Sequence, residues 1–170
     1  LARAALAEVV AVGEIGLDYA KSTAPPEVQR PAFERLVALA RRSGKPAVVH
    51  CRDAYADLLA ILERAWPGPP EAGTRFKGVV HCFSGGTAEA LRCKALGFAL
   101  GVDGPVTYPK NDALRAALRA AGPECLVLET DSPWLPPQSS RGKRNEPAYV
   151  VEIAAALAET LGMSPEEVAA

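Results

Sequence analysis

Short apolar runs alternate along this chain with longer segments of helical periodicity, and this order limits the fold more than any other feature of the sequence. An apolar run bounded by glycine or proline is typical of a buried strand. Five runs qualify, over residues 9–15, 47–51, 78–82, 98–102 and 125–130. Alternating strands and helices predict a parallel sheet with right-handed crossovers, so we expect an α/β fold.

The segments between these runs carry helix signals. The first has Phe33, Leu36, Val37 and Ala40 at one-face spacing and meets a stop signal at Gly44. Further helices are expected over about residues 53–66, 87–96, 111–122 and 149–160. A capping box predicts one more helix. It runs from Ser164 to Glu167 and has proline at the first helical position.

The spacing of the strands raises the question of an open or a closed sheet. Glu14 and His50 are 36 residues apart, and His50 and His81 are 31 apart. A barrel of eight strand–helix units uses about 31 residues per unit. By pattern alone, an open five-stranded sheet and part of such a barrel fit this chain equally well.

Composition limits the class of protein. The 170 residues are 49% hydrophobic and carry a formal net charge of -1, which predicts one globular domain over residues 1–170 and no global basic surface. No apolar run is long enough for a membrane span, and no signal segment is visible at the start. Four cysteines without C-x-x-C spacing indicate reduced thiols, so we expect a cytoplasmic protein without membrane partners.

Both histidines of the chain close the same phrase, V-V-H-C, at His50 and His81. Because side chains alternate along a strand, they share a face with Glu14 and Asp131 of other strands, and all four can converge at one edge of a parallel sheet. Carboxylates with imidazoles suit Zn²⁺, Mn²⁺, Mg²⁺ or a related divalent ion, and two ions can share such a site. The pattern therefore predicts a metal site.

Each of these residues also has a structural interpretation. A histidine at a strand end is often only hydrogen-bonded, although two in equivalent positions favour ligation. Glu14 could cap a turn or pair with an arginine; the glycines on either side indicate a tight backbone beside a site. For Asp131, an N-cap or Asx turn before Pro133 fits as well as ligation.

Other candidates have less support from the pattern. Cys51 and Cys82 follow the histidines, so they face the opposite side, toward the helices, and we expect small buried hydrophobes rather than zinc ligands. Asp103 lies in a G-V-D-G-P turn, where aspartate is common, and Asp18 is expected to shape the loop after the first strand.

Three basic residues, Arg141, Lys143 and Arg144, follow the strand that carries Asp131. Such a run is usually a solvated surface, but beside a metal site it could hold phosphates. Phe83 and Trp134 each lie just beyond a candidate ligand, where they could stack on a base or belong to the core.

Five motifs follow one another along the chain: G-E-I-G-L-D-Y at 13–19, V-V-H-C-R-D-A at 48–54, V-V-H-C-F-S-G at 79–85, L-E-T-D-S-P-W-L-P-P at 128–137 and R-G-K-R-N-E-P at 141–147. Together they resemble the TatD family of metal-dependent deoxyribonucleases. The resemblance implies a TIM-type barrel with a centre of two divalent ions, Mg²⁺ favoured and Zn²⁺ or Mn²⁺ as alternatives. The implied activity is exonuclease hydrolysis of DNA, single-stranded or at 3′ ends, by a metal-activated water. We expect the complete protein to be a monomer.

The resemblance also implies roles for single residues. Glu14 corresponds to a carboxylate shared by two metals, and His50 and His81 to imidazoles on one of them. Asp131 corresponds to the carboxylate that binds the other metal and orients the attacking water, which makes Glu14 and Asp131 the expected catalytic residues. Arg141, Lys143, Arg144 and Phe83 are the expected substrate-binding residues.

One departure from the family pattern concerns the H-x-H motif of the first strand, which this chain lacks. The chain starts near the fourth strand, so we expect a truncated barrel of about five strands that corresponds to the C-terminal two-thirds of the family. Alternatives are another metal-dependent ester or amide hydrolase, such as an aminoacyl-tRNA deacylase, and a non-catalytic truncated paralogue. An in-frame D-x-H-x-H about 80 to 100 residues upstream would support the nuclease.

Overall fold

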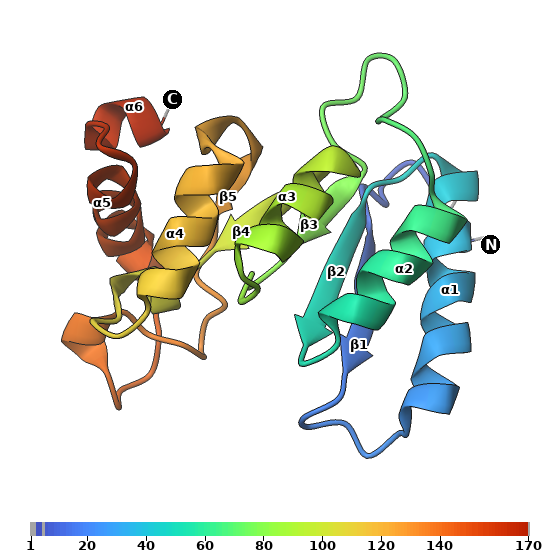
Figure 1. Ribbon diagram of the computed structural model, residues 1–170, viewed down its shortest axis with the longest axis horizontal. Helices are drawn as coiled ribbons and strands as arrows, with labels where there is room; N and C mark the ends of the chain where they lie inside the picture. Colours follow the sequence, from blue (N-terminus) through green and yellow to red (C-terminus); the bar gives the residue numbers. More distant parts are fainter. Residues whose placement is uncertain (1–2, 5, 170) are drawn as a thin grey trace. The chain divides into compact units, whose positions relative to one another are not determined.

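The computed structural model describes residues 3, 4 and 6–169, and strands and helices alternate along them (Figure 1). The strands are β1 (Val12–Asp18), β2 (Ala47–Arg52), β3 (Gly78–Val80), β4 (Phe98–Val102) and β5 (Leu126–Leu128). The helices are α1 (Pro26–Ser43), α2 (Tyr55–Ala65), α3 (Thr87–Ala95), α4 (Asp112–Ala121), α5 (Val150–Leu161) and α6 (Pro165–Ala169). The predicted alternation of strands with helices is therefore confirmed.

The described chain divides into two compact units. The first contains the residues up to His81 together with Arg92–Ala99, and the second contains Cys82–Leu91 and the residues from Leu100 onward. Strands β1 to β3 belong to the first unit, β5 belongs to the second, and the boundary falls inside β4. The prediction of a single domain over residues 1–170 stays a prediction.

In the first unit, β2 pairs in parallel with both β1 and β3. Gly16 lies opposite His50 and Asp18 opposite Arg52, whereas the pairing is irregular between Val12 and Ile15. The predicted bounds of the first strand were wrong by three residues. Val10 is exposed and lies before the strand, whereas Leu17 is fully buried and lies within it. The apolar run begins in the loop before β1, so it does not mark the residue at which the strand begins.

Helices α1 and α2 cover this part of the sheet and pack against each other (Figure 1). Phe33, Val37 and Ala40 are buried as their spacing predicts, and Gly44 ends α1 in the left-handed conformation. Leu36 departs from the prediction, because it remains partly exposed. From the sheet, Leu17 and Val49 are fully buried, so the core of this unit lies between the strands and the two helices.

In the second unit, β4 pairs in parallel with β5, and Leu100, Gly101 and Val102 lie opposite Leu126, Val127 and Leu128. Helix α5 packs against α4 and β5, and its Ile153 and Leu157 are buried. Strand β5 is shorter than the predicted range of 125–130, because Cys125 ends a 3₁₀ turn and Glu129 lies beyond the last paired residue.

The C-terminal capping box forms as predicted. The Ser164 hydroxyl accepts the backbone N–H of Glu167 at 3.1 Å, and the Glu167 carboxylate accepts the N–H of Ser164 at 2.7 Å. Among the described helices, none has both the length and the hydrophobicity that a membrane crossing requires. None of the four cysteines, all of which lie in the described residues, forms a disulfide.

Candidate metal centre

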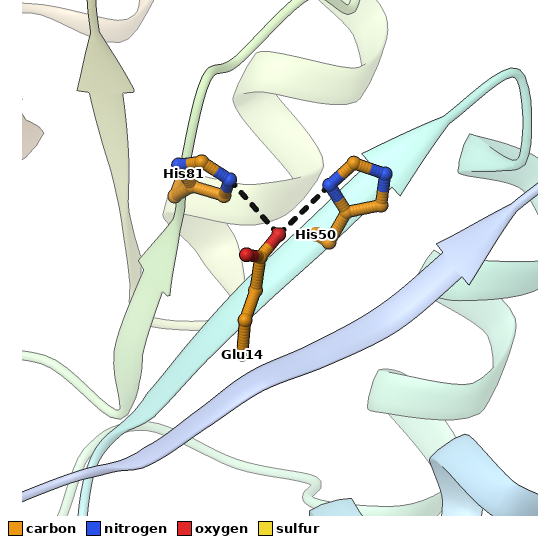
Figure 2. Close-up of side chains that lie close together, drawn as sticks. All are labelled: Glu14, His50 and His81. Carbon is orange, nitrogen blue, oxygen red and sulfur yellow. Dashed lines mark hydrogen bonds and ion pairs between the residues drawn. The ribbon is translucent and has the colours of Figure 1, made fainter. Parts of the chain in front are cut away.

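Three of the predicted ligands meet within the first unit. The carboxylate oxygen Oε1 of Glu14 lies 2.9 Å from Nδ1 of His50 and 3.0 Å from Nε2 of His81 (Figure 2). One ligand atom from each residue can be chosen so that all three lie within 4.8 Å of one another. The convergence that the repeated V-V-H-C phrase predicts is present for Glu14, His50 and His81.

Neighbouring strands place these side chains. Glu14 lies in the irregular part of β1, His50 lies inside β2 and His81 directly follows β3, where its N–H donates to the Val49 carbonyl at 2.9 Å. A Cβ atom on Gly16 would come within 1.9 Å of the His50 carbonyl oxygen, so only glycine allows β1 to pair here. The prediction of a tight backbone beside the site is confirmed for Gly16.

The donor set fits a divalent cation. Two imidazole nitrogens and a carboxylate oxygen are ligands that Zn²⁺ and Mn²⁺ accept readily, while Mg²⁺ prefers oxygen. Half of the Glu14 side chain is exposed, and the two histidines are mostly buried. The carboxylate oxygen thus faces solvent from between two fixed rings, an arrangement in which an ion can reach all three donors.

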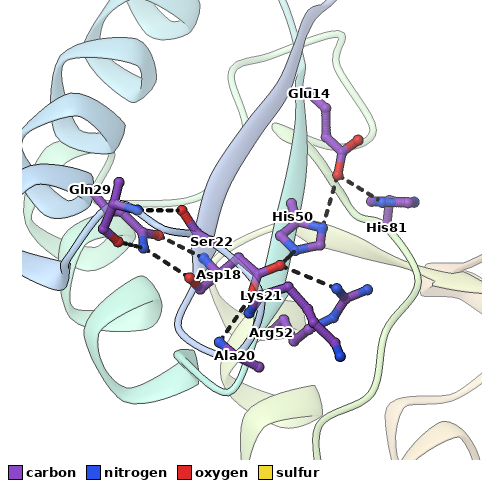
Figure 3. Close-up of polar contacts among 10 residues, drawn as sticks. Glu14, Asp18, Ala20, Lys21, Ser22, Gln29, His50, Arg52 and His81 are labelled. Atoms are coloured by element: carbon purple, nitrogen blue, oxygen red, sulfur yellow. Dashed lines mark hydrogen bonds and ion pairs between the residues drawn. The ribbon is translucent and has the colours of Figure 1, made fainter.

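Asp18 joins this cluster, which the sequence analysis did not predict. Its Oδ2 lies 3.3 Å from Nε2 of His50 and 3.2 Å from Nη1 of Arg52 (Figure 3). Its Oδ1 accepts the backbone N–H groups of Ala20 at 3.0 Å and Lys21 at 2.7 Å, so the predicted role in shaping the loop is confirmed. The contact with His50 is a second role, and the sequence signal for it was the four-residue spacing from Glu14.

The charge of Asp18 is favoured by these contacts. Burial raises the pKa of the carboxyl group, but the N–H groups of Lys21 and Ala20, the charge of Arg52 and the contact with His50 together lower the pKa below its usual value. Asp18 is therefore an ionised acceptor beside His50.

Asp131 lies in the second unit, three residues beyond the end of β5, with a left-handed backbone at φ 55°. Its loop is held by Asn145, a fully buried residue that the sequence analysis missed. The Asn145 amide donates to the carbonyls of Thr130 at 2.6 Å and Trp134 at 2.5 Å, on either side of Asp131. Only its place in the R-G-K-R-N-E-P motif could have drawn attention to Asn145.

The thiol of Cys82 makes a polar contact in the second unit. Its Sγ donates to Oδ2 of Asp103 at 3.0 Å, so the prediction of a simple buried hydrophobe is wrong for Cys82, because its left-handed backbone turns the side chain toward the carboxylate. The prediction is confirmed for Cys51, which is buried. Burial raises the pKa of the Cys51 thiol to about 12.

Asp103 is the most buried carboxylate among the described residues, with 2% of its surface exposed. Burial raises its pKa to about 7; the Cys82 thiol opposes this effect, and the charges of Glu129 and Asp131 add to it. The turn that the sequence predicts is present, since the Asp103 carbonyl accepts the N–H of Val106 at 3.1 Å. Its depth of burial had no signal in the sequence.

The predicted substrate-binding residues also lie in the second unit. The Arg141 guanidinium stacks over the Tyr108 ring at 3.9 Å, Arg144 pairs with Glu146 at 3.4 Å, and Lys143 is exposed. Phe83 is only 1% exposed, which is inconsistent with its predicted use as a stacking surface, because no face of the ring is accessible to a base. Trp134 is 69% exposed and keeps that role open.

The sequence profile of the family described as TatD related DNase matches residues 1–170. The chain belongs to the TatD family. It is 37% identical over 162 residues to YabD of Bacillus subtilis, described as an uncharacterized metal-dependent hydrolase, covering 95% of this chain and 61% of that protein. It is 38% identical to TatD of Citrobacter rodentium, a 3′-5′ ssDNA/RNA exonuclease, covering 100% of this chain and 64% of that protein.

Solved TatD structures match the fold. YJJV, a TatD homologue of Escherichia coli K12, superposes with a TM-score of 0.84 at 33% identity, covering 96% of this chain and 60% of that chain. A TatD family hydrolase of Entamoeba histolytica gives 0.77 at 26% identity, covering 94% and 59%. The predicted fold class is confirmed: five parallel strands alternate with helices as in part of a TIM-type TatD barrel. The chain spans about 60% of the length of these relatives.

Proposed function

We propose that this TatD-family chain belongs to a metal-dependent exonuclease that hydrolyses phosphodiester bonds of DNA, with single-stranded or 3′ ends as substrate. The observation that carries the proposal is the Glu14 carboxylate oxygen held between the imidazoles of His50 and His81. The exonuclease activity described for the Citrobacter rodentium relative supports the choice of substrate. Because the chain spans about 60% of that protein, the activity is proposed for the complete protein.

Glu14, His50 and His81 would hold one divalent ion, and Asp131 would bind a second. A divalent ion at such a site polarises phosphate oxygens and supplies hydroxide from water near neutral pH. Asp131, in the loop that follows β5, would orient the attacking water toward phosphorus and accept its proton. Mg²⁺ is the first ion to test, with Zn²⁺ and Mn²⁺ beside it because imidazoles favour them.

The basic loop would hold the substrate. Arg141, Lys143 and Arg144 can donate to phosphate oxygens, and the Arg141 guanidinium already packs over the Tyr108 ring. The exposed Trp134 ring replaces Phe83 as the proposed surface for base stacking. This assignment predicts that removing one of these three positive charges weakens the binding of DNA to a similar extent for every DNA sequence. It also predicts that the affinity then depends less on the salt concentration.

The experiment uses protein expressed from the complete reading frame that encodes this chain. Single-stranded DNA labelled at either end is incubated with Mg²⁺, Mn²⁺ or Zn²⁺, and with EDTA as the metal-free control. We expect shortening from the 3′ end that EDTA abolishes, and loss of at least about 100-fold for His81→Ala and Asp131→Ala, since each would remove a metal ligand. Glu63→Gln, which changes a surface carboxylate paired with Arg92, is the matched control.

If the labelled DNA stays intact in the presence of each of the three ions, the proposed nuclease activity is refuted. An aminoacyl ester substrate assayed in parallel separates the remaining alternatives. Hydrolysis of that ester alone would assign the site to another ester class, and hydrolysis of neither substrate would favour the non-catalytic paralogue.

A further inference from the structure

His50 has a partner at each of its ring nitrogens. Nδ1 faces Glu14 at 2.9 Å, and Nε2 faces Asp18 at 3.3 Å. Both partners are carboxylates, and a neutral imidazole has only one proton to donate. An imidazolium could donate to both carboxylates, but only the neutral ring can bind an ion. In that form one nitrogen donates to a carboxylate and the other presents its lone pair.

The surroundings decide which nitrogen carries the proton. Glu14 also contacts His81 and lies half exposed, where an ion can take the place of the proton between carboxylate and ring. Asp18 lies on the other side of the ring, away from His81 (Figure 3). With Nδ1 presented to the metal, the proton lies on Nε2 and is donated to Asp18.

Asp18 is itself held in place from several directions. Oδ1 accepts the N–H groups of Ala20 and Lys21, which leaves Oδ2 for His50 and Arg52. The Gln29 amide fixes the Asp18 backbone: it accepts the Asp18 N–H and donates to the Asp18 carbonyl, each at 2.8 Å. The acceptor for His50 is thus oriented before any metal binds.

We propose that Asp18 is a positioning residue of the metal centre: its Oδ2 holds the His50 ring with Nε2 protonated, so that Nδ1 presents its lone pair beside Glu14 and His81. The proposal rests on the proposed function only in treating His50 as a metal ligand. Carboxylates that hold ligating imidazoles in this way typically strengthen metal binding 10- to 100-fold, so Asp18 contributes to the site without touching the ion.

Asp18→Asn tests this role without removing the loop contacts. The N–H groups of Ala20 and Lys21 can only donate, so the amide oxygen of the variant takes the place of Oδ1. The amide NH₂ then takes the place of Oδ2 and donates toward Nε2 of His50. The imidazole proton should move to Nδ1, which turns the lone pair away from the site while the loop keeps its hydrogen bonds.

Two measurements follow this change, on protein from the complete reading frame. Long-range ¹⁵N–¹H spectra of metal-free protein, recorded at a pH where the His50 ring carries a single proton, identify the protonated nitrogen, and the signal is assigned by its loss in His50→Gln. Competition with a zinc chelator gives the Zn²⁺ affinity. We expect Nε2 protonated in the wild type, Nδ1 protonated in Asp18→Asn, both forms in Asp18→Ala, and Zn²⁺ binding at least about 10-fold weaker in both variants.

Arg52→Ala is the matched control, because it removes the other partner of Oδ2 and leaves the contact between Asp18 and His50; it should keep Nε2 protonated. Wild-type protonation and affinity in Asp18→Asn would overturn the proposal and reduce Asp18 to a loop residue. If Asp18→Asn moves the proton and weakens Zn²⁺ binding while the wild type leaves DNA intact, the proposed nuclease activity is refuted but the positioning role of Asp18 is supported. Should Asp18→Asn fail to fold, the same readings on Asp18→Ala decide.

Discussion

Asp103→Asn should change how the stability of the protein depends on pH. The folded chain keeps the Asp103 carboxyl protonated up to about pH 7, whereas the unfolded chain releases that proton near its ordinary pKa of 3.8. Between these values the folded state binds more protons, so stability falls as the pH rises. The interval corresponds to about 4 kcal/mol, at about 1.4 kcal/mol for each pH unit.

Asparagine has the shape of the protonated carboxyl group but does not titrate. Its side-chain oxygen can still accept the Cys82 thiol, which donates to Asp103 at 3.0 Å. The variant should therefore gain stability relative to the wild type as the pH rises, by up to about 4 kcal/mol between about pH 4 and pH 7. At the acid end, where both side chains are neutral, the two proteins should differ little.

Urea unfolding of both proteins at half-unit pH steps measures this difference, and all other titrating groups cancel in it. Cys82→Ala gives a second reading: the thiol lowers the pKa of Asp103, so its loss should extend the interval to higher pH. A constant difference between Asp103→Asn and the wild type from about pH 4 to pH 7 would refute the reasoning, because the folded chain would then not hold the proton.

Three further predictions concern single contacts. Gly16→Ala should cost more than about 3 kcal/mol of unfolding free energy in thermal melts, because its Cβ would lie 1.9 Å from the His50 carbonyl oxygen. Burial and the contact with Asp57 raise the pKa of Tyr19 to about 12, so stability should fall from about pH 10 to pH 12, and Tyr19→Phe should lose this fall in alkaline denaturation. Asn145→Ala should cost about 1–3 kcal/mol in urea unfolding, since two carbonyls lose their donor.

The convergence of the candidate ligands could be predicted from the sequence because it follows from strand periodicity. His50 and His81 repeat one phrase at equivalent positions of neighbouring strands, and parallel pairing brings equivalent positions together. The same reasoning misplaced the first strand by three residues, since hydrophobicity does not distinguish the loop at Val10 from the strand that follows it. Glu14 was still assigned to the correct face, because side chains alternate along a strand. Whether two residues share a face depends on whether an even number of positions separates them, and not on where the strand begins.

The partners of the candidate ligands had much weaker signals in the sequence. Asp18 has the chemistry of a loop aspartate, and its contact with His50 arises from register: Gly16 lies opposite His50, so Asp18 follows two residues later on the same face. Asn145 lies 15 residues from the carbonyl of Thr130 that it holds, and only the folded loop brings them together. Ligand positions are local properties of strands, whereas the orientation of a ligand is a tertiary property. Local and tertiary effects are therefore separated by variants such as Asp18→Asn, which keeps the local hydrogen bonds and changes only the tertiary contacts with His50 and Arg52.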